Sequence, residues 1–375
     1  MSKIFDYSKI AINDTFVGRD EELKRLSSDF FLLTNAAVLA PRGYGKSSLI
    51  HAAAQVAAHR DKDLRFCFVD LSNVRNEERF YELLCQGVLK AVSRNQEEVV
   101  ENVKRLFSNV VPRISFDSSG DFTVDLDWSQ ARNNQDELLN LPVSAAEIMG
   151  VKLVVCVDEF HLISLFSDPD SLVDRIKTRW VVHEKVSYCI SGIRLSFVDK
   201  FLKSSSAFYR YGDVMDLVPV RKVDMIRYMR DRFADNGKYL DDEMAGMIVD
   251  FSEGNSFYTI QLAHLSWLGT SVVCSDDVVE AAFENMVDQM DMVFRNITEG
   301  LTTQQLCYLH AVLAGETVIS TSEVLHRHHI TSATSATRSK AALMERGLVC
   351  NPGGKICLSD PVYAHWLKSR YFFKK

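Results

Sequence analysis

The stretch that decides the fold is Ala40–Ser48, which reads APRGYGKSS. It follows a short apolar run, residues 36–39, and leads into an alanine-rich segment, so the local order is strand, loop, helix. Gly43 and Gly45 allow the backbone N–H groups of such a loop to converge on a polyphosphate. The positive end of a helix beginning near Lys46 adds to the attraction. The pattern therefore predicts a phosphate-binding loop.

Side chains of the same loop supply further chemistry. Lys46 offers an ammonium group to the β and γ phosphates, and the Ser47 hydroxyl is placed to bind Mg²⁺. Ala40 stands where the pattern usually has its first glycine, at a position that opens the loop and does not crowd the phosphates. A chance match is the alternative, and the flanking strand and helix argue against it. We expect ATP and Mg²⁺ as cofactors, with nucleotide contacts from Arg42, Gly43, Tyr44, Gly45, Lys46, Ser47 and Ser48.

A second motif, Val154–Phe160 (VVCVDEF), delivers two acidic residues at the end of an apolar strand. Ligands of parallel sheets bind at the carboxyl edge, where these acids would lie. We expect Asp158 to hold Mg²⁺ through water and Glu159 to orient or deprotonate the attacking water. The alternative is a solvated strand end, which the phosphate loop in the same sheet disfavours.

Three more residues are candidates for completing this site. Ser191 ends another apolar strand, CISG, where its hydroxyl can sense the γ-phosphate or bond the attacking water. Arg194 or Arg210 can neutralise charge on the transferring phosphoryl group. The alternatives are an ordinary strand end for Ser191 and a surface position for each arginine.

The order of elements indicates several parts. The chain of 375 residues has the composition of a folded globular protein and is long enough for two or three domains. Strand and helix patterns alternate through residues 1–219, with an insertion at about 93–135 that contains a hairpin around Ser-Ser-Gly. Residues 220–297 carry only helical patterns, the last over 276–294. Residues 298–375 read as three short helices, each after a Thr or Ser that can cap it, and a hairpin.

Charge and cysteine usage narrow the function classes. The formal charge is −7, yet residues 298–375 hold 9 Lys and Arg against 5 Asp and Glu, which marks a distinct basic module. The 8 cysteines are never spaced as CxxC, so reduced thiols are expected. Three histidines and two cysteines near the end fit no standard zinc spacing: His326, His328, His329, Cys350 and Cys357.

Without a membrane-length apolar run or a signal-peptide pattern, the sequence predicts a soluble, cytoplasmic protein with no membrane partner.

Three helices followed by a two-stranded wing describe a winged-helix unit. If this unit reads duplex DNA, its third helix, about residues 332–346, would enter the major groove with Arg338 and Lys340 exposed. The modest positive charge of the module leaves the alternative of a protein-facing role, as a docking surface for a partner or for self-association.

Taken together, these motifs resemble the STAND-type AAA+ P-loop ATPases of the archaeal type, over nearly the whole chain. The resemblance rests on FVGRDEELKRL, APRGYGKSS, VVCVDEF, ISG, FYRYGDVMDLVP, EGNSFYTIQ and SDPVYAHWL. It implies that Val17, Gly18 and Arg19 lie near the adenine. It also implies that Asp158 and Glu159 form the Walker B pair and that Ser191 sits at the sensor position. Ser256 stands where the family's lid motif usually has proline.

The expected fold is α/β, with a P-loop parallel sheet flanked by helices over residues 1–219, a helical lid over 220–297 and a winged-helix domain over 298–375. The expected function is a slow ATP-hydrolysing switch in which nucleotide bound between sheet edge and lid rearranges the winged helix. Two alternatives stay open. One is a DNA-binding regulator or a mobile-element or defence ATPase, and the other is an adaptor that holds nucleotide without turnover.

Overall fold

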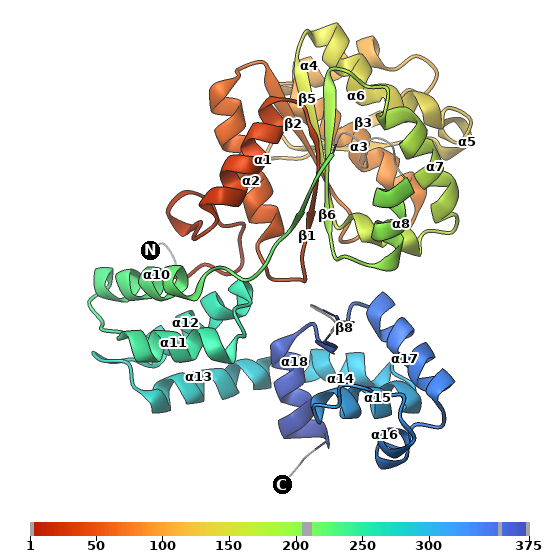
Figure 1. Cartoon of the computed structure of the whole chain (residues 1–375). Helices are drawn as coiled ribbons and strands as arrows, with labels where there is room; N and C mark the ends of the chain where they lie inside the picture. The colour runs from red at the N-terminus through yellow and green to blue at the C-terminus, as the bar shows by residue number, and fades with distance from the viewer. Residues whose placement is uncertain (1–3, 205–211, 352–354, 373–375) are drawn as a thin grey trace. The chain divides into compact units, whose positions relative to one another are not determined.

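The computed structural model describes residues 4–204, 212–351 and 355–372 (Figure 1). The chain divides into two compact units. We call Arg19–Ala40 with Lys46–Leu217 the sheet unit, and Met1–Gly18, Pro41–Gly45 and Val218–Lys375 the helical unit. The domain boundaries given above stay a prediction. Within the described residues, no helix is both long and apolar enough to cross a bilayer.

Five parallel strands form the centre of the sheet unit, in the order β2-β5-β6-β1-β7. Their bounds are β1 (Asn35–Leu39), β2 (Leu64–Asp70), β5 (Lys152–Asp158), β6 (Val186–Gly192) and β7 (Gly212–Asp216). The predicted fold class is confirmed. Sequence reasoning missed β7, an edge strand whose residues are mostly half-buried and in which aspartates flank only two apolar residues, so that it lacks the continuous apolar run of a central strand.

Helices cover both faces of this sheet, as Figure 1 shows. Strand residues alternate between the faces: Val155 and Ile190 join the large core formed with α3, α6, α7 and α8, whereas Val154 and Cys189 face the other way. The helices of the sheet unit are α1 (Asp20–Phe31), α2 (Lys46–Arg60), α3 (Glu77–Val92), α4 (Gln96–Leu106), α5 (Trp128–Ala131), α6 (Gln135–Met149), η2 (Phe160–Leu165), α7 (Pro169–Trp180) and α8 (Ser196–Ser204).

The predicted hairpin is confirmed inside the insertion. Strand β3 (Arg113–Phe116) pairs antiparallel with β4 (Phe122–Asp125), and Gly120 takes a φ of 89° in the turn between them. Helix α4 precedes the hairpin and was not predicted, although Asn95 caps its first turn by accepting a hydrogen bond from the Glu98 N–H.

The helical unit begins with a short turn and continues through the predicted helical region. Its first elements are η1 (Asn13–Thr15), α10 (Lys222–Asp235), α11 (Asp242–Phe251), α12 (Ser256–Gly269), α13 (Asp276–Gln289) and α14 (Asp291–Glu299). The single helix predicted over 276–294 is wrong. The chain breaks at Met290, whose N–H donates to the carbonyl of Val287 in a tightened last turn, and a new helix starts at Asp291. Both helices bury apolar residues in one core, so the periodicity alone did not reveal the break.

The C-terminal elements follow the predicted order of three helices and a hairpin. They are α15 (Thr303–Leu313), α16 (Ser322–Arg327), α17 (Ala333–Glu345), β8 (Val349–Cys350), β9 (Cys357–Leu358), α18 (Pro361–Trp366) and the π-helical η4 (Leu367–Phe372). Thr302 and Ser332 cap their helices as expected, but the Thr321 side chain makes no capping hydrogen bond at α16. The Pro-Gly-Gly of the predicted turn, residues 352–354, lies outside the described residues.

Candidate functional site

The predicted phosphate loop joins β1 directly to α2. Gly43 and Gly45 both have a φ of 81°, a left-handed conformation that other residues rarely adopt. Gly43 is also crowded, because an added Cβ would lie 2.3 Å from the amide oxygen of Asn255. Asn255 donates from its side chain to the Arg42 carbonyl at 3.0 Å, and the Phe257 N–H donates to the Gly43 carbonyl at 3.0 Å. The loop is thus bound to the first turn of α12.

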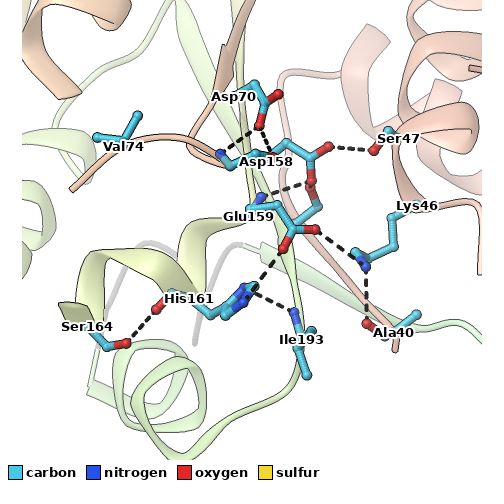
Figure 2. A network of polar contacts seen from close by, with 12 residues as sticks. Ala40, Lys46, Ser47, Asp70, Val74, Asp158, Glu159, His161, Ser164 and Ile193 are labelled. Atoms are coloured by element: carbon cyan, nitrogen blue, oxygen red, sulfur yellow. Dashed lines mark hydrogen bonds and ion pairs between the residues drawn. The ribbon is translucent and has the colours of Figure 1, made fainter. Parts of the chain in front are cut away.

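Lys46 is buried in the sheet unit, with 5% of its surface exposed. Its ammonium group donates to the Ala40 carbonyl at 3.2 Å and lies 3.8 Å from Oε1 of Glu159 (Figure 2). A buried ammonium requires such acceptors, since removal from water penalises the charged form. The contacts hold the lysine beside the carboxyl end of β5.

Asp158 lies at the centre of a group of hydroxyls. Ser47 at the start of α2 and Ser191 in β6 each donate to one oxygen of its carboxylate at 2.5 Å, and the Glu159 N–H donates to the same oxygen as Ser191, at 2.9 Å. The strand period explains this meeting, because Asp158 shares the face of Val154 and Ser191 that of Cys189, both turned away from the large core. Three residues predicted from separate motifs are therefore brought together.

These oxygens also fit a magnesium ion. Mg²⁺ prefers oxygen ligands, keeps several waters, and uses one or two protein groups beside substrate phosphates. The Ser47 hydroxyl and the Asp158 carboxylate form such a pair. Within the described residues, no group of three or more His, Cys, Asp and Glu side chains is arranged to hold a metal.

Sequence reasoning missed His161, which lies in η2 two residues after Glu159. Its Nε2 is 3.6 Å from Oε2 of Glu159, and its Nδ1 accepts a hydrogen bond of 3.4 Å from the Ile193 N–H (Figure 2). The imidazole is buried, with 6% of the side chain exposed. His161 is part of the DEFH sequence. Nothing in the spacing of that sequence predicted that a 3-10 helix begins directly after Glu159.

A second missed residue is His51, one turn after Ser47 on α2. Its ring stacks on Phe68 of β2 with centroids 4.1 Å apart and an interplanar angle of 12°. Burial lowers the pKa of His51, and the negative charge of Asp158 opposes that shift. His51 is therefore an uncharged neighbour of the carboxylate at neutral pH.

The remaining predicted residues are spread over both units, and one lies outside the described residues. Gly18, with a φ of 66°, packs against Val220 and Asp224 in the helical unit. Arg19, the third residue of the VGR motif, is buried in the sheet unit and pairs with Glu22 at 3.1 Å. Arg194 pairs with Asp216 at 3.1 Å. Val17, Tyr44 and Ser48 are half-buried, and Arg210 lies outside the described residues.

Near the C-terminus, the structure brings two cysteines together. Cys350 and Cys357 are directly opposite each other in the β8–β9 pair, with sulfurs 3.3 Å apart. The hydrogen bond from Cys357 lowers the pKa of Cys350 to about 7, whereas the pKa of Cys357 is raised. Separately, His328 contacts His310 at 2.9 Å and Glu316 at 3.2 Å.

Comparisons with known proteins support the fold. No protein-family model and no curated protein sequence matches the chain. Among solved structures, a Walker-type ATPase of Pyrococcus abyssi is similar with a TM-score of 0.69 and 14% identity, over 98% of this chain and 100% of that one. The Aeropyrum pernix Orc2 protein, in its ADPNP and ADP complexes, gives 0.60 and 12%, over 96% and 94%. The Aeropyrum pernix Orc1 protein in complex with DNA gives 0.52 and 14%, over 95% and 93%. The chain therefore has the fold of AAA+ P-loop ATPases.

Proposed function

We propose that this protein binds ATP with Mg²⁺ and hydrolyses it slowly, as a nucleotide-driven switch of the STAND type. The observation that carries the proposal is the meeting at Asp158 of hydroxyls from α2 and β6, beside a buried pair of Lys46 and Glu159. Phosphoryl transfer needs this combination of a cation, a metal-binding carboxylate and a group that positions water.

Each residue has a distinct part in the proposed reaction. Ser47 and Asp158 would hold Mg²⁺, which when bound neutralises charge on the phosphates. Lys46, freed from Glu159 by the incoming phosphates, neutralises the β and γ oxygens. Glu159 accepts a proton from the attacking water, and the hydroxyl of Ser191 keeps the Asp158 carboxylate oriented.

Single-turnover hydrolysis of ATP tests this proposal. Glu159→Gln is expected to slow phosphate release by at least about 100-fold while leaving ATP bound, because the amide cannot accept the proton. Lys46→Ala is expected to weaken binding as well as slow the reaction. Asp174→Asn, which changes an exposed carboxylate of α7 with 76% of its side chain accessible, is the matched control. Retained binding with a rate unaffected by Glu159→Gln would instead favour an adaptor without turnover.

A series of four hydrogen bonds supports the switch. The loop is bonded to α12 through Asn255 and Phe257, and the next residue, Tyr258, donates its hydroxyl to Asp360 at 2.6 Å. Asp360 caps α18 by accepting from the Tyr363 N–H at 2.9 Å. A change at the loop on nucleotide binding can therefore reach the C-terminal helices through the first turn of α12.

Hydrogen–deuterium exchange checks the switch directly. A non-hydrolysable ATP analogue and ADP should give different protection in α18, and Asn255→Ala should remove most of that difference without abolishing nucleotide binding. Equal protection in both nucleotide states would contradict the switch and leave the ATPase proposal standing.

A second function, binding of duplex DNA, is favoured by the elements of residues 298–372. Helix α17 follows two helices and precedes a two-stranded sheet, as in a winged helix, and Arg338 on it is exposed and Lys340 half-exposed. The similar Orc1 protein was solved in complex with DNA. We propose phosphate contacts from these two side chains.

Fluorescence anisotropy with a labelled duplex tests DNA binding. Arg338→Ala and Lys340→Ala should weaken binding across sequences and each reduce the slope of log K against log salt by about 1. Lys368→Ala, on the exposed side of η4, is the control. No binding at low salt would leave the alternative of a protein partner or self-association.

A further inference from the structure

The buried imidazole of His161 faces the carboxylate proposed to activate water. We propose that His161 is a positioning residue that orients Glu159 through a hydrogen-bond donor at Nε2. The inference rests on the proposed ATPase function and adds to it a residue that does not itself touch the nucleotide.

The hydrogen bond on the other side of the ring assigns the proton. Nδ1 of His161 accepts from the Ile193 N–H, so it carries no hydrogen. In a neutral imidazole the proton is then on Nε2. That nitrogen lies 3.6 Å from Oε2 of Glu159, and an ionised carboxylate can only accept a hydrogen bond.

The backbone around the ring leaves it little freedom. Gly192, at the end of β6, leaves space for the imidazole, since an added Cβ would lie 2.9 Å from Nδ1 of His161. The same Cβ would lie 3.5 Å from the backbone nitrogens of Phe160 and His161, so the adjacent chain also limits the space. Phe160 is 1% exposed and belongs to the large core, which fixes the start of η2. The ring is therefore held by packing and by a main-chain bond.

Glu159 needs such a partner. Its φ of 55° is a left-handed conformation that is strained for a residue with a Cβ, and its carboxylate lies between Lys46 and His161. In the proposed reaction Lys46 turns to the phosphates, so Oε1 of Glu159 loses its contact with the lysine ammonium group. His161 would then hold the second oxygen in place while the first faces the water.

Two substitutions of similar chemistry test the donor. His161→Asn keeps a polar group at the position of Nδ1 and reaches no further, whereas His161→Gln places an amide N–H near the position of Nε2. We expect His161→Asn to lower kcat by about 10- to 100-fold with KM and the ATP dissociation constant unchanged. His161→Gln should recover most of that loss.

A double-mutant cycle separates positioning from a general loss of structure. In a Glu159→Gln background, His161→Asn should lower the residual rate little further, because the group that it orients is already absent. Equal losses of rate in both backgrounds, or a His161→Asn enzyme with wild-type kcat, would overturn the inference. So would a variant whose melting temperature and ATP affinity fall together with its rate, unrescued by His161→Gln.

Gly192→Ala is a second test of the positioning role of His161. The added methyl group displaces the imidazole without changing its chemistry, and a smaller fall in kcat at unchanged ATP affinity is expected. A wild-type rate in this variant would contradict the inferred role of His161 in orienting Glu159. If the wild-type protein itself neither binds nor hydrolyses ATP, the proposed function fails first, which distinguishes that outcome from a failure of His161 alone.

Discussion

The two units of the molecule differ in how their polar contacts relate to the chain. In the sheet unit, polar residues meet at one edge: Asp158 and Ser191 lie at the ends of apolar strands, and Ser47 lies at the start of the helix that follows the phosphate loop. In the helical unit, the bond from Tyr258 to Asp360 joins the first turn of α12 to the N-cap of α18, inside one core shared by the helical region and the C-terminal elements. Chemistry at a sheet edge is therefore readable from local sequence, whereas coupling between packed helices is not.

The largest expected effect tests whether the two units unfold separately. Trp366 is 1% exposed in the helical unit, and Trp180 is 2% exposed in the sheet unit, where it stacks on Tyr188 at 3.9 Å. Replacing either with alanine should lower the free energy of unfolding by about 3 to 5 kcal/mol, because each leaves a large cavity. Circular dichroism in denaturant should show two unfolding transitions. Each variant should shift to lower denaturant concentration only the transition of the unit that carries its substitution. A single transition that both variants shift equally would mean that the units unfold as one.

The next largest effect is expected for the Asp158 carboxylate at the carboxyl edge of the sheet. Asp158→Asn is expected to slow ATP hydrolysis by about 100-fold and to abolish its dependence on Mg²⁺, since a neutral amide binds that ion poorly. Asp70, its register partner on β2, is exposed and accepts hydrogen bonds from Ser72. Asp70→Asn should keep a rate close to wild type. A similar loss in both variants would show that edge position, and not the contacts with Ser47 and Ser191, decides the effect.

A smaller effect is expected where the helical unit depends on tertiary contact. Tyr258→Phe removes the donor to Asp360 and should destabilise the helical unit by about 1 kcal/mol, since a half-buried acceptor loses its partner. Burial raises the pKa of Asp360 and the Tyr258 hydroxyl opposes that rise, so the variant should raise the Asp360 pKa further. NMR titration of the carboxyl group checks the direction. Tyr239→Phe, at a side chain that is 54% exposed, should change neither quantity.

The smallest effect concerns the β8–β9 pair. Because the pKa of Cys350 is lowered to about 7, its thiolate should form as the pH rises through that value, below the range of ordinary thiols. Iodoacetamide should therefore alkylate Cys350 before Cys307, a half-buried cysteine outside the β8–β9 pair, at neutral pH. Cys357→Ala removes the hydrogen bond that stabilises the thiolate and should move the onset of alkylation to higher pH. An unchanged onset would show that the two sulfurs do not interact in solution.

Much of the candidate site could be predicted before the structure was known. The loop at Gly43–Ser47 and the acids after β5 stand at strand ends, where local pattern and sheet geometry coincide. β7 was missed because it has only two apolar residues, Val214 and Met215, between aspartates. The break at Met290 was missed because two helices on one core keep a common periodicity. His161 was missed because its proposed role depends on a hydrogen bond from the N–H of Ile193, the residue directly after β6.

The sequence by itself determined the fold class, because apolar runs, glycines and helix starts are local properties of the chain. It also determined which oxygens and which ammonium group meet at the carboxyl edge of the sheet. Only the tertiary structure decided that His161 faces Glu159, that Asn255 is bonded to the phosphate loop, and that Tyr258 reaches Asp360. The last two contacts join segments far apart in the chain, and the first depends on a hydrogen bond from Ile193, so no period or spacing in the sequence records them.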